Sequence, residues 1–198
     1  MSRYVITITR QFGSLGRPIA KRLSEILGIE YYDRDIVEEA SQKLKLPVSV
    51  ISDNEETSST FFRMLFPLGT ENVSHQKKIF ETQTKIIRDI TEKESCIIVG
   101  RCSDYILRGE KNALHVYIYA PLDARMKNCV ESLGMSVYEA EKMIMEVDRA
   151  RTAFHKQYAK YGPGEPTSKH LLINSAFLGV EETAQLLADA ARRKFGCQ

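Results

Sequence analysis

Residues 4–18, YVITITRQFGSLGRP, join a β-branched run to a turn with two glycines, and a helical pattern follows directly. Tyr4–Thr9 reads as a buried strand. Apolar residues then recur at helical spacing until Gly28, which predicts a helix that ends there. A strand, a glycine-rich turn and a helix in this order can bind phosphate, because the turn points N–H groups inward and the helix N-terminus adds partial positive charge.

The turn departs from the phosphate-loop pattern GxxxxGK[ST]. Gln11 stands at its first glycine, Arg17 at its lysine and Pro18 at its hydroxyl. Gly13 and Gly16 still permit close approach of an anion. Arginine keeps the positive charge as a planar fork, whereas proline suits a first helical turn but cannot ligate a metal. Two interpretations stay open: a phosphate-binding loop, and a tight turn without a ligand.

Short β-branched runs alternate with longer helical patterns along the chain. Most of the runs lack polar alternation, as strands covered on both faces do. This alternation predicts an α/β fold with a central parallel sheet and crossover helices, built as a single domain over residues 1–198. The predicted strands are Tyr4–Thr9, Glu30–Tyr32, Cys96–Gly100, Leu114–Tyr119 and Leu171–Asn174.

The composition is that of an ordinary globular protein, with 43% hydrophobic and 27% charged residues and a net charge of +2. This charge gives no reason to expect a nucleic-acid or membrane partner. The first apolar run is too short for a signal peptide, so we expect a cytoplasmic protein. Four cysteines show no metal-ligand spacing and are expected to be free thiols. The four histidines are dispersed and are expected to be structural or exposed.

Two segments interrupt the regular pattern. Residues 49–60 are polar and acidic, and residues 61–68, FFRMLFPL, are aromatic and apolar. The second stretch reads either as a buried core helix or as a surface that covers a site or meets a partner, including a second copy of the chain. Residues 136–166 form a charged helical pattern that runs into the loop sequence YGPGEP.

Four stretches in order resemble the cytidylate kinase-like family, a branch of the P-loop nucleoside monophosphate kinases. They are RQFGSLGR at 10–17, YYDR at 31–34, IVGR at 98–101 and VYIYAPLDAR at 116–125. The resemblance covers essentially the whole chain. It implies a three-layer P-loop NTPase fold with a helical insert for the monophosphate at 34–94 and an arginine-rich lid at 126–166.

The resemblance also assigns roles around a transferred phosphoryl group. The backbone amides of the loop would hold the ATP phosphates, with Arg17 neutralising charge. Gly100 and Arg101 match the pair that holds the substrate monophosphate. Cys102 replaces the aspartate that follows this pair, so Asp104, the nearest acid, is expected to bind the substrate with Arg101. Arginine suits phosphate because its fork donates two parallel hydrogen bonds. The loop residues in this role are Gly13, Ser14, Leu15, Gly16 and Arg17.

The remaining implied residues each have a plainer interpretation. In the lid element Asp148-Arg149-Ala150-Arg151, Asp148 would bind the substrate and both arginines would contact the phosphoryl group being transferred. The plainer interpretation is a solvent-exposed helix face. Asp33 and Arg34 would bind the substrate, or Asp33 would contact the metal ion through a water molecule. The plainer interpretation is that Asp33 caps a helix. Arg125 would lie near the ATP base, or it is a surface arginine.

Together these residues predict an ATP-dependent phosphotransferase that acts on a nucleoside monophosphate such as CMP or dCMP, or on a similar small phosphate-bearing acceptor. Mg²⁺ would arrive bound to ATP, with no direct protein ligand. The departures at Gln11, Arg17, Pro18 and Cys102 leave an alternative: a nucleotide-binding regulatory protein on the same fold that has lost catalysis.

Overall fold

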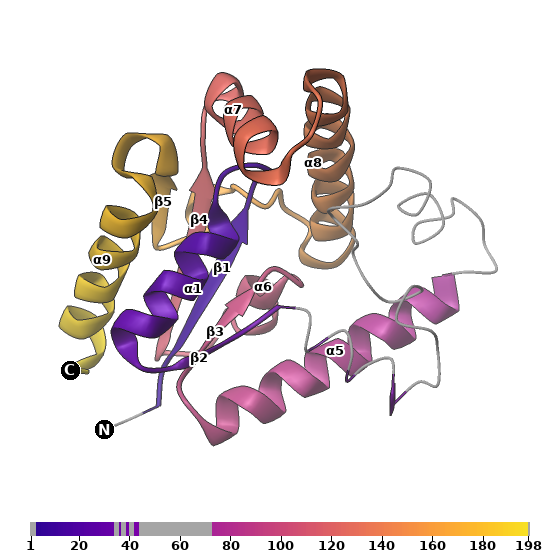
Figure 1. Cartoon of the computed structure of the whole chain (residues 1–198). Helices are drawn as coiled ribbons and strands as arrows, with labels where there is room; N and C mark the ends of the chain where they lie inside the picture. Colours follow the sequence, from indigo (N-terminus) through magenta and orange to yellow (C-terminus); the bar gives the residue numbers. More distant parts are fainter. Residues whose placement is uncertain (1–2, 34–35, 37–38, 40–41, 44–72, 198) are drawn as a thin grey trace.

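The computed structural model describes residues 3–33, 36, 39, 42–43 and 73–197, and a five-stranded parallel sheet forms its centre (Figure 1). The strand order is β2-β3-β1-β4-β5. All five strands were predicted from the sequence, and the ends of β1, β3 and β4 differ from the prediction by one residue. The bounds are β1 Val5–Arg10, β2 Glu30–Tyr32, β3 Cys96–Val99, β4 Ala113–Tyr119 and β5 Leu171–Asn174.

Helices cover both faces of this sheet. Helices α1 (Gly16–Leu27) and α9 (Ser175–Phe195) pack on one face, and α5 (Val73–Lys93) and α6 (Ser103–Ile106) pack on the other (Figure 1). Alternate side chains of β1 serve the two layers, because Ile6 and Ile8 join the first core whereas Val5 joins the second. The predicted three-layer α/β architecture is therefore confirmed.

Two further helices lie beyond the carboxyl end of β1. Helix α7 (Leu122–Leu133) and helix α8 (Val137–Ala159) form a third apolar cluster with Phe12, the second residue after β1. A capping box at Ser136 and Glu139 fixes the start of α8. A short 3-10 helix, η2 (Pro166–Ser168), leads from α8 back to β5.

The strand order identifies where a ligand is expected. The chain runs from β1 to the β2 and β3 side of the sheet, and later crosses to β4 on the other side of β1. Connections therefore diverge at the carboxyl end of β1, and ligands of open α/β sheets bind at such switch points. The loop at residues 11–15 lies at this position.

Several sequence predictions lie outside the described residues, namely those for Arg34 and for the segments 49–60 and 61–68. The division into an insert at 34–94 and a lid at 126–166 stays a prediction. All four cysteines are free thiols. Within the described ranges, no helix combines the length and the apolar character that a membrane crossing requires.

Candidate functional site

The loop after β1 adopts left-handed backbone conformations at two positions. Gly13 has a φ of +74°, and a Cβ there would lie 2.9 Å from the carbonyl oxygen of Arg125 and 3.0 Å from Sγ of Cys129. Leu15 has a φ of 60° and precedes the first residue of α1. Burial raises the pKa of the Cys129 thiol, so a neutral, apolar group packs beneath the loop. The close fit fixes the loop backbone against α7.

The loop side chains turn inward and leave the backbone to face a ligand. The hydroxyl of Ser14 is fully buried and lies 2.9 Å from the carbonyl oxygen of Gln11. Among the described residues, the amide N–H groups of Gly13, Ser14, Leu15 and Gly16 have no hydrogen-bond acceptor. Unsatisfied amides at a helix N-terminus are suited to hold an anion.

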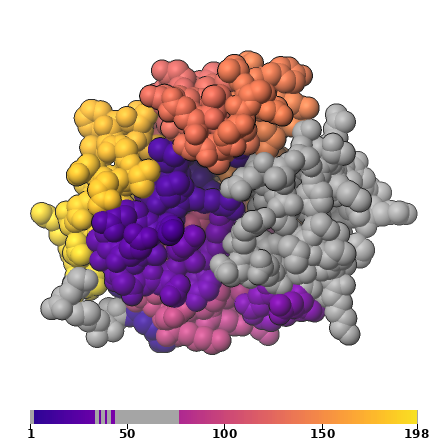
Figure 2. Space-filling view, viewed as in Figure 1, coloured from indigo at the N-terminus to yellow at the C-terminus, as the bar shows by residue number. Residues whose placement is uncertain are grey.

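A pocket of about 110 Å³ opens beside these amides. Its walls are the loop residues Phe12, Gly13 and Leu15, the first residues of α1, the last turns of α7, and Arg10 and Arg151. Asn128 of α7 donates a hydrogen bond of 2.8 Å to the carbonyl oxygen of Gly13, which ties the two walls together. The space-filling view shows the indigo N-terminal segment directly against the orange α7 region (Figure 2).

Three arginines surround the buried carboxylate of Asp33, which follows β2. Nε of Arg17 lies 2.5 Å from Oδ2 of Asp33. The Nη2 atoms of Arg10 and Arg101 lie 3.8 and 3.7 Å from Oδ1. Asp33 is 4% exposed, so these charges interact with little solvent screening. Among the described residues, Asp33 thus draws three guanidinium groups together at the carboxyl end of the sheet.

Arg101 reaches this cluster from a turn with three consecutive left-handed residues. The φ angles of Gly100, Arg101 and Cys102 are 76°, 58° and 51°. Only the first is a glycine, and a non-glycine residue in this region costs about 1–2 kcal/mol. Such strain persists where the surrounding structure imposes it, and it is concentrated at functional sites. The turn ends at Cys102, which is the N-cap of α6.

Helix α8 holds the loop through two of its side chains. Asp148 accepts a hydrogen bond of 2.8 Å from the amide of Phe12 and is paired with Nη1 of Arg125, which also donates to the carbonyl oxygen of Phe12 at 3.3 Å. Arg151 donates from Nη1 to the carbonyl oxygen of Arg10 at 3.0 Å. Arg149 is exposed on α8 and is not part of these contacts.

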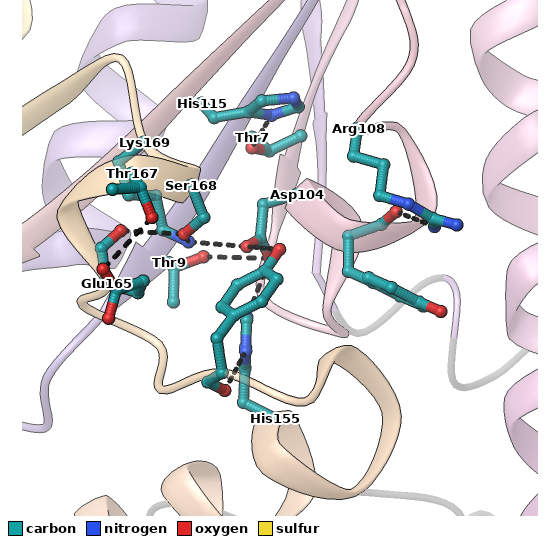
Figure 3. Close-up of polar contacts among 12 residues, drawn as sticks. Thr7, Thr9, Asp104, Arg108, His115, His155, Glu165, Thr167, Ser168 and Lys169 are labelled. Atoms are coloured by element: carbon teal, nitrogen blue, oxygen red, sulfur yellow. Dashed lines mark hydrogen bonds and ion pairs between the residues drawn. The ribbon is translucent and has the colours of Figure 1, made fainter.

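A second buried polar cluster centres on Asp104 of α6 (Figure 3). Its Oδ2 lies 2.5 Å from Nζ of Lys169 and 3.2 Å from the hydroxyl of Tyr161, and its Oδ1 lies 3.0 Å from Nε2 of His155. Thr9 of β1 approaches Oδ1 at 3.5 Å. The side chains of Asp104 and Lys169 are fully buried. The cluster joins α6 to the end of α8 and to the segment before β5.

The ring of His155 faces two hydrogen-bond acceptors. Besides Asp104, its Nδ1 lies 3.3 Å from the carbonyl oxygen of Tyr161. Burial lowers the pKa of His155 and outweighs the opposing effect of the Asp104 charge. A neutral imidazole can donate to only one of these two acceptors. Burial also raises the pKa of Tyr161, so its hydroxyl remains a donor to Asp104.

The family model described as the cytidylate kinase-like family matches residues 5–176. That range contains the loop, the arginine cluster and α8. The chain belongs to the cytidylate kinase-like family.

Curated relatives of this kinase-like chain include two archaeal enzymes. A cytidylate kinase of Aeropyrum pernix is 21% identical over 189 residues, which are 92% of this chain and 95% of that protein. A cytidylate kinase of Methanopyrus kandleri is 24% identical over 195 residues, 94% of this chain and 92% of that one. A uronate isomerase of Corynebacterium glutamicum is 23% identical over 127 residues, or 64% of this chain, and the match spans only 24% of the isomerase.

Solved structures show the same fold. An uncharacterized protein from Eubacterium ventriosum matches with a TM-score of 0.74 at 23% identity, over 96% of this chain and 98% of that one. The shikimate kinase from Acinetobacter baumannii matches with a TM-score of 0.55 at 13% identity, over 98% and 96% of the two chains. The predicted P-loop kinase fold is thus confirmed for this cytidylate kinase-like chain.

Most of the residues that the sequence singled out converge at the carboxyl end of β1. The structure brings the loop from Gly13 to Arg17 together with Asp33 and Arg101, and connects it to Asp148 and Arg151. Arg125 is 8% exposed and holds Phe12 and Asp148, so it is not a surface arginine.

Two predicted residues lie apart from this arrangement. Asp104 contacts Thr9, His155, Tyr161 and Lys169 rather than the arginines around Asp33, as far as the described residues show. Arg149 points to solvent. Their predicted roles on the substrate and over the transferring group stay predictions.

The sequence reasoning missed Arg10 of this kinase-like chain. It is the last residue of the central strand, only 7% exposed, and it lines the pocket. The signal was present, because a charged residue at the carboxyl end of a strand is placed where α/β proteins bind ligands. His155, Tyr161 and Lys169 were also missed, and no local sequence pattern relates them to Asp104.

Proposed function

We propose that this chain transfers the γ-phosphoryl group of ATP to a nucleoside monophosphate, such as CMP or dCMP, or to a similar small phosphate-bearing acceptor. One observation carries this proposal. The carboxylate of Asp33 contacts both Arg17, from the first turn of α1, and Arg101, from the strained turn after β3. Two cationic segments suited to two phosphate groups therefore adjoin each other, as direct transfer between phosphates requires.

The donor side is formed by the loop. The N–H groups of Gly13–Gly16 would hold the phosphates of ATP at the start of α1, where the helix dipole adds partial positive charge. Arg17 would neutralise further charge from the first turn. Asn128 and Asp148 do not compete for these amides, because they bond the carbonyl oxygen of Gly13 and the amide of Phe12.

The acceptor side is formed by the turn after β3. The side chain of Arg101 is 4% exposed, so its guanidinium would bind the acceptor phosphate in a poorly solvated setting where charge-assisted hydrogen bonds are strong. Asp104 is not assigned to the acceptor, since both of its oxygens are taken by protein groups. We assign it to holding α6, and thereby the turn, in place.

The transfer itself needs positioning and positive charge more than covalent chemistry from the protein. An oxygen of the dianionic acceptor phosphate forms a bond to the γ-phosphorus. The bond from that phosphorus to the β–γ bridging oxygen breaks, its electron pair stays with ADP, and no proton has to move. Arg17, Arg101 and, from α8, Arg151 would stabilise the charge that spreads over the transferring group.

The residues of the loop fit ATP and leave its magnesium to the phosphates and water. Pro18 offers no hydroxyl, and the carboxylate of Asp33 is held by arginines. Within the described residues, no cluster of three or more His, Cys, Asp or Glu side chains could hold a metal. Mg²⁺ retains several waters readily and would supply charge neutralisation between the β- and γ-phosphates when bound.

The test is an ADP-release assay with Mg-ATP against CMP, dCMP, UMP and AMP, using the wild type, Arg17→Ala, Arg101→Ala and the surface control Arg22→Ala. Arg22 pairs with Glu181 and Glu25 in solvent. We expect turnover with at least one monophosphate, a fall of about 100-fold or more in kcat/KM for the first two variants, and no change for Arg22→Ala. Binding of ATP without turnover on any acceptor would instead favour a regulatory protein.

A further inference from the structure

Arg10 has an unusual position for so large a charged side chain. It is the last residue of β1, the central strand, and it pairs with Ile118 of β4 in the sheet. Only 7% of its surface is exposed. A cation is buried at the carboxyl edge of a strand only where it is paired or binds a ligand.

Two glycines mark the path of the Arg10 side chain. A Cβ at Gly16 would lie 2.7 and 2.8 Å from Cβ and Cγ of Arg10, so the stem crosses the first residue of α1. A Cβ at Gly100 would lie 2.2 Å from Nη1, so the guanidinium rests on the turn after β3. Arg10 therefore extends from the ATP-binding loop to the acceptor turn, and both segments have a glycine where it passes.

The charges around the guanidinium agree with a bridging position. One carboxylate oxygen of Asp33 binds Arg17 of α1, and the other faces Arg10 and Arg101. In addition, Arg151 of α8 donates to the carbonyl oxygen of Arg10 and fixes its main chain. Asp33 thus acts as a counter-ion that assembles three guanidinium groups before any phosphate arrives.

We propose that Arg10 is a catalytic residue that binds the donor and acceptor phosphates at once. The inference rests on the proposed phosphotransferase function. The planar guanidinium has five N–H donors and can serve two oxyanions from one rigid group. Because the guanidinium lies between the two phosphate sites, its contacts strengthen as charge moves onto the transferring group.

The test compares ligands that fill one site with a ligand that fills both. Calorimetry measures the binding of three ligands: Mg-ATP, CMP, and a joined ligand in which five phosphates link adenosine to cytidine. The proteins are the wild type, Arg10→Ala, Arg10→Lys and the control Arg22→Ala. For Arg10→Ala we expect losses of a fewfold for each single ligand and about 100-fold for the joined ligand. Arg10→Lys should lie between, because it keeps charge without the fork.

A rescue experiment separates this role from a structural one. Added guanidinium chloride at millimolar concentration should restore part of the kcat of Arg10→Ala and leave the kcat of Arg22→Ala unchanged. The inference is overturned if the fold-loss in affinity of Arg10→Ala for the joined ligand is no larger than the product of its fold-losses for Mg-ATP and for CMP. If Arg10→Ala does not fold, the same comparison of the joined-ligand loss with the two single-ligand losses is made for Arg10→Lys. A wild type that binds none of the three ligands refutes the proposed function itself, and the role of Arg10 with it.

Discussion

The carboxylate of Asp148 accepts a hydrogen bond from the backbone amide of Phe12, 136 residues earlier in the chain, at 2.8 Å. The same carboxylate is paired with Arg125, whose guanidinium also contacts the carbonyl oxygen of Phe12. One side chain of α8 therefore fixes the start of the loop on which ATP binding is proposed to depend.

Asp148→Asn should destabilise the fold and weaken binding of ATP. The substitution keeps an acceptor for Phe12 but leaves Arg125 largely buried without its counter-charge. We expect a loss of about 1–3 kcal/mol in the free energy of unfolding, measured by urea titration, and a raised KM for ATP. Glu141→Gln, an exposed change on the same helix, is the control. Equal stabilities for the two variants would show that the pair does not secure the loop.

Gly13→Ala should lower the free energy of unfolding by more than the strain of a left-handed backbone alone. Gly134 has a similar φ of +67° but open space around its Cβ position, so Gly134→Ala reports only backbone strain, about 1–2 kcal/mol. At Gly13 the new methyl group must also displace Arg125 or Cys129. We expect a loss of about 3 kcal/mol or more, and weaker ATP binding, from Gly13→Ala only. Similar losses in both variants would contradict the close contact beneath the loop.

Asp104→Asn should strongly lower the free energy of unfolding. It leaves the fully buried ammonium of Lys169 without a compensating charge, which costs about 3–5 kcal/mol. Adding Lys169→Met should recover a large part of that loss, because the double variant buries neither charge. Urea unfolding of both single variants and the double variant gives the coupling energy. Strictly additive losses would mean that the two side chains do not interact.

Stability should fall as the pH drops from 6.5 towards 4. Burial, followed by the nearby His170, lowers the pKa of His115 from 6.5 to about 4. Between these values the unfolded chain binds a proton that the folded chain does not, so acid favours unfolding. The penalty reaches about 2 kcal/mol at pH 5 and about 3 kcal/mol below pH 4, and it is absent above pH 7.

His115→Gln isolates this contribution, because its amide can still meet the Thr7 hydroxyl that lies 2.8 Å from Nδ1 of His115. Urea unfolding at pH 7.5 and pH 5.0 should show a stability difference about 2 kcal/mol smaller in the variant than in the wild type. Unchanged pH dependence would show that His115 titrates normally in the folded chain.

The sheet was predictable because its signals are local. Runs such as Cys96–Val99 are apolar and β-branched, and they fit no other element of that length. The predicted strand ended at Thr9, one residue early, because the backbone of Arg10 continues the pairing with β4. Register depends on backbone hydrogen bonds to a neighbouring strand, which side-chain character alone does not reveal.

The site was predictable only in part, because its long-range contacts leave no local pattern. Asp104 was chosen as the nearest acid after Arg101, yet its counter-ion Lys169 lies 65 residues further along the chain. One long-range feature is visible in the sequence, since Asp148, Arg151 and His155 follow a spacing of three and four and share one helix face. Arg149 falls outside that spacing and is exposed.

The fit of Arg10 against Gly16 and Gly100 makes these three positions a single unit for engineering. A designer who installs a standard phosphate loop by changing only Arg17 to lysine and Pro18 to serine leaves the arginine across the start of α1 in place. Conversely, a methyl group at position 100 would displace the guanidinium of Arg10 and would also be strained by the φ of +76° at that position. Sequence design on this scaffold should therefore treat residues 10, 16 and 100 together, although they are distant in the chain.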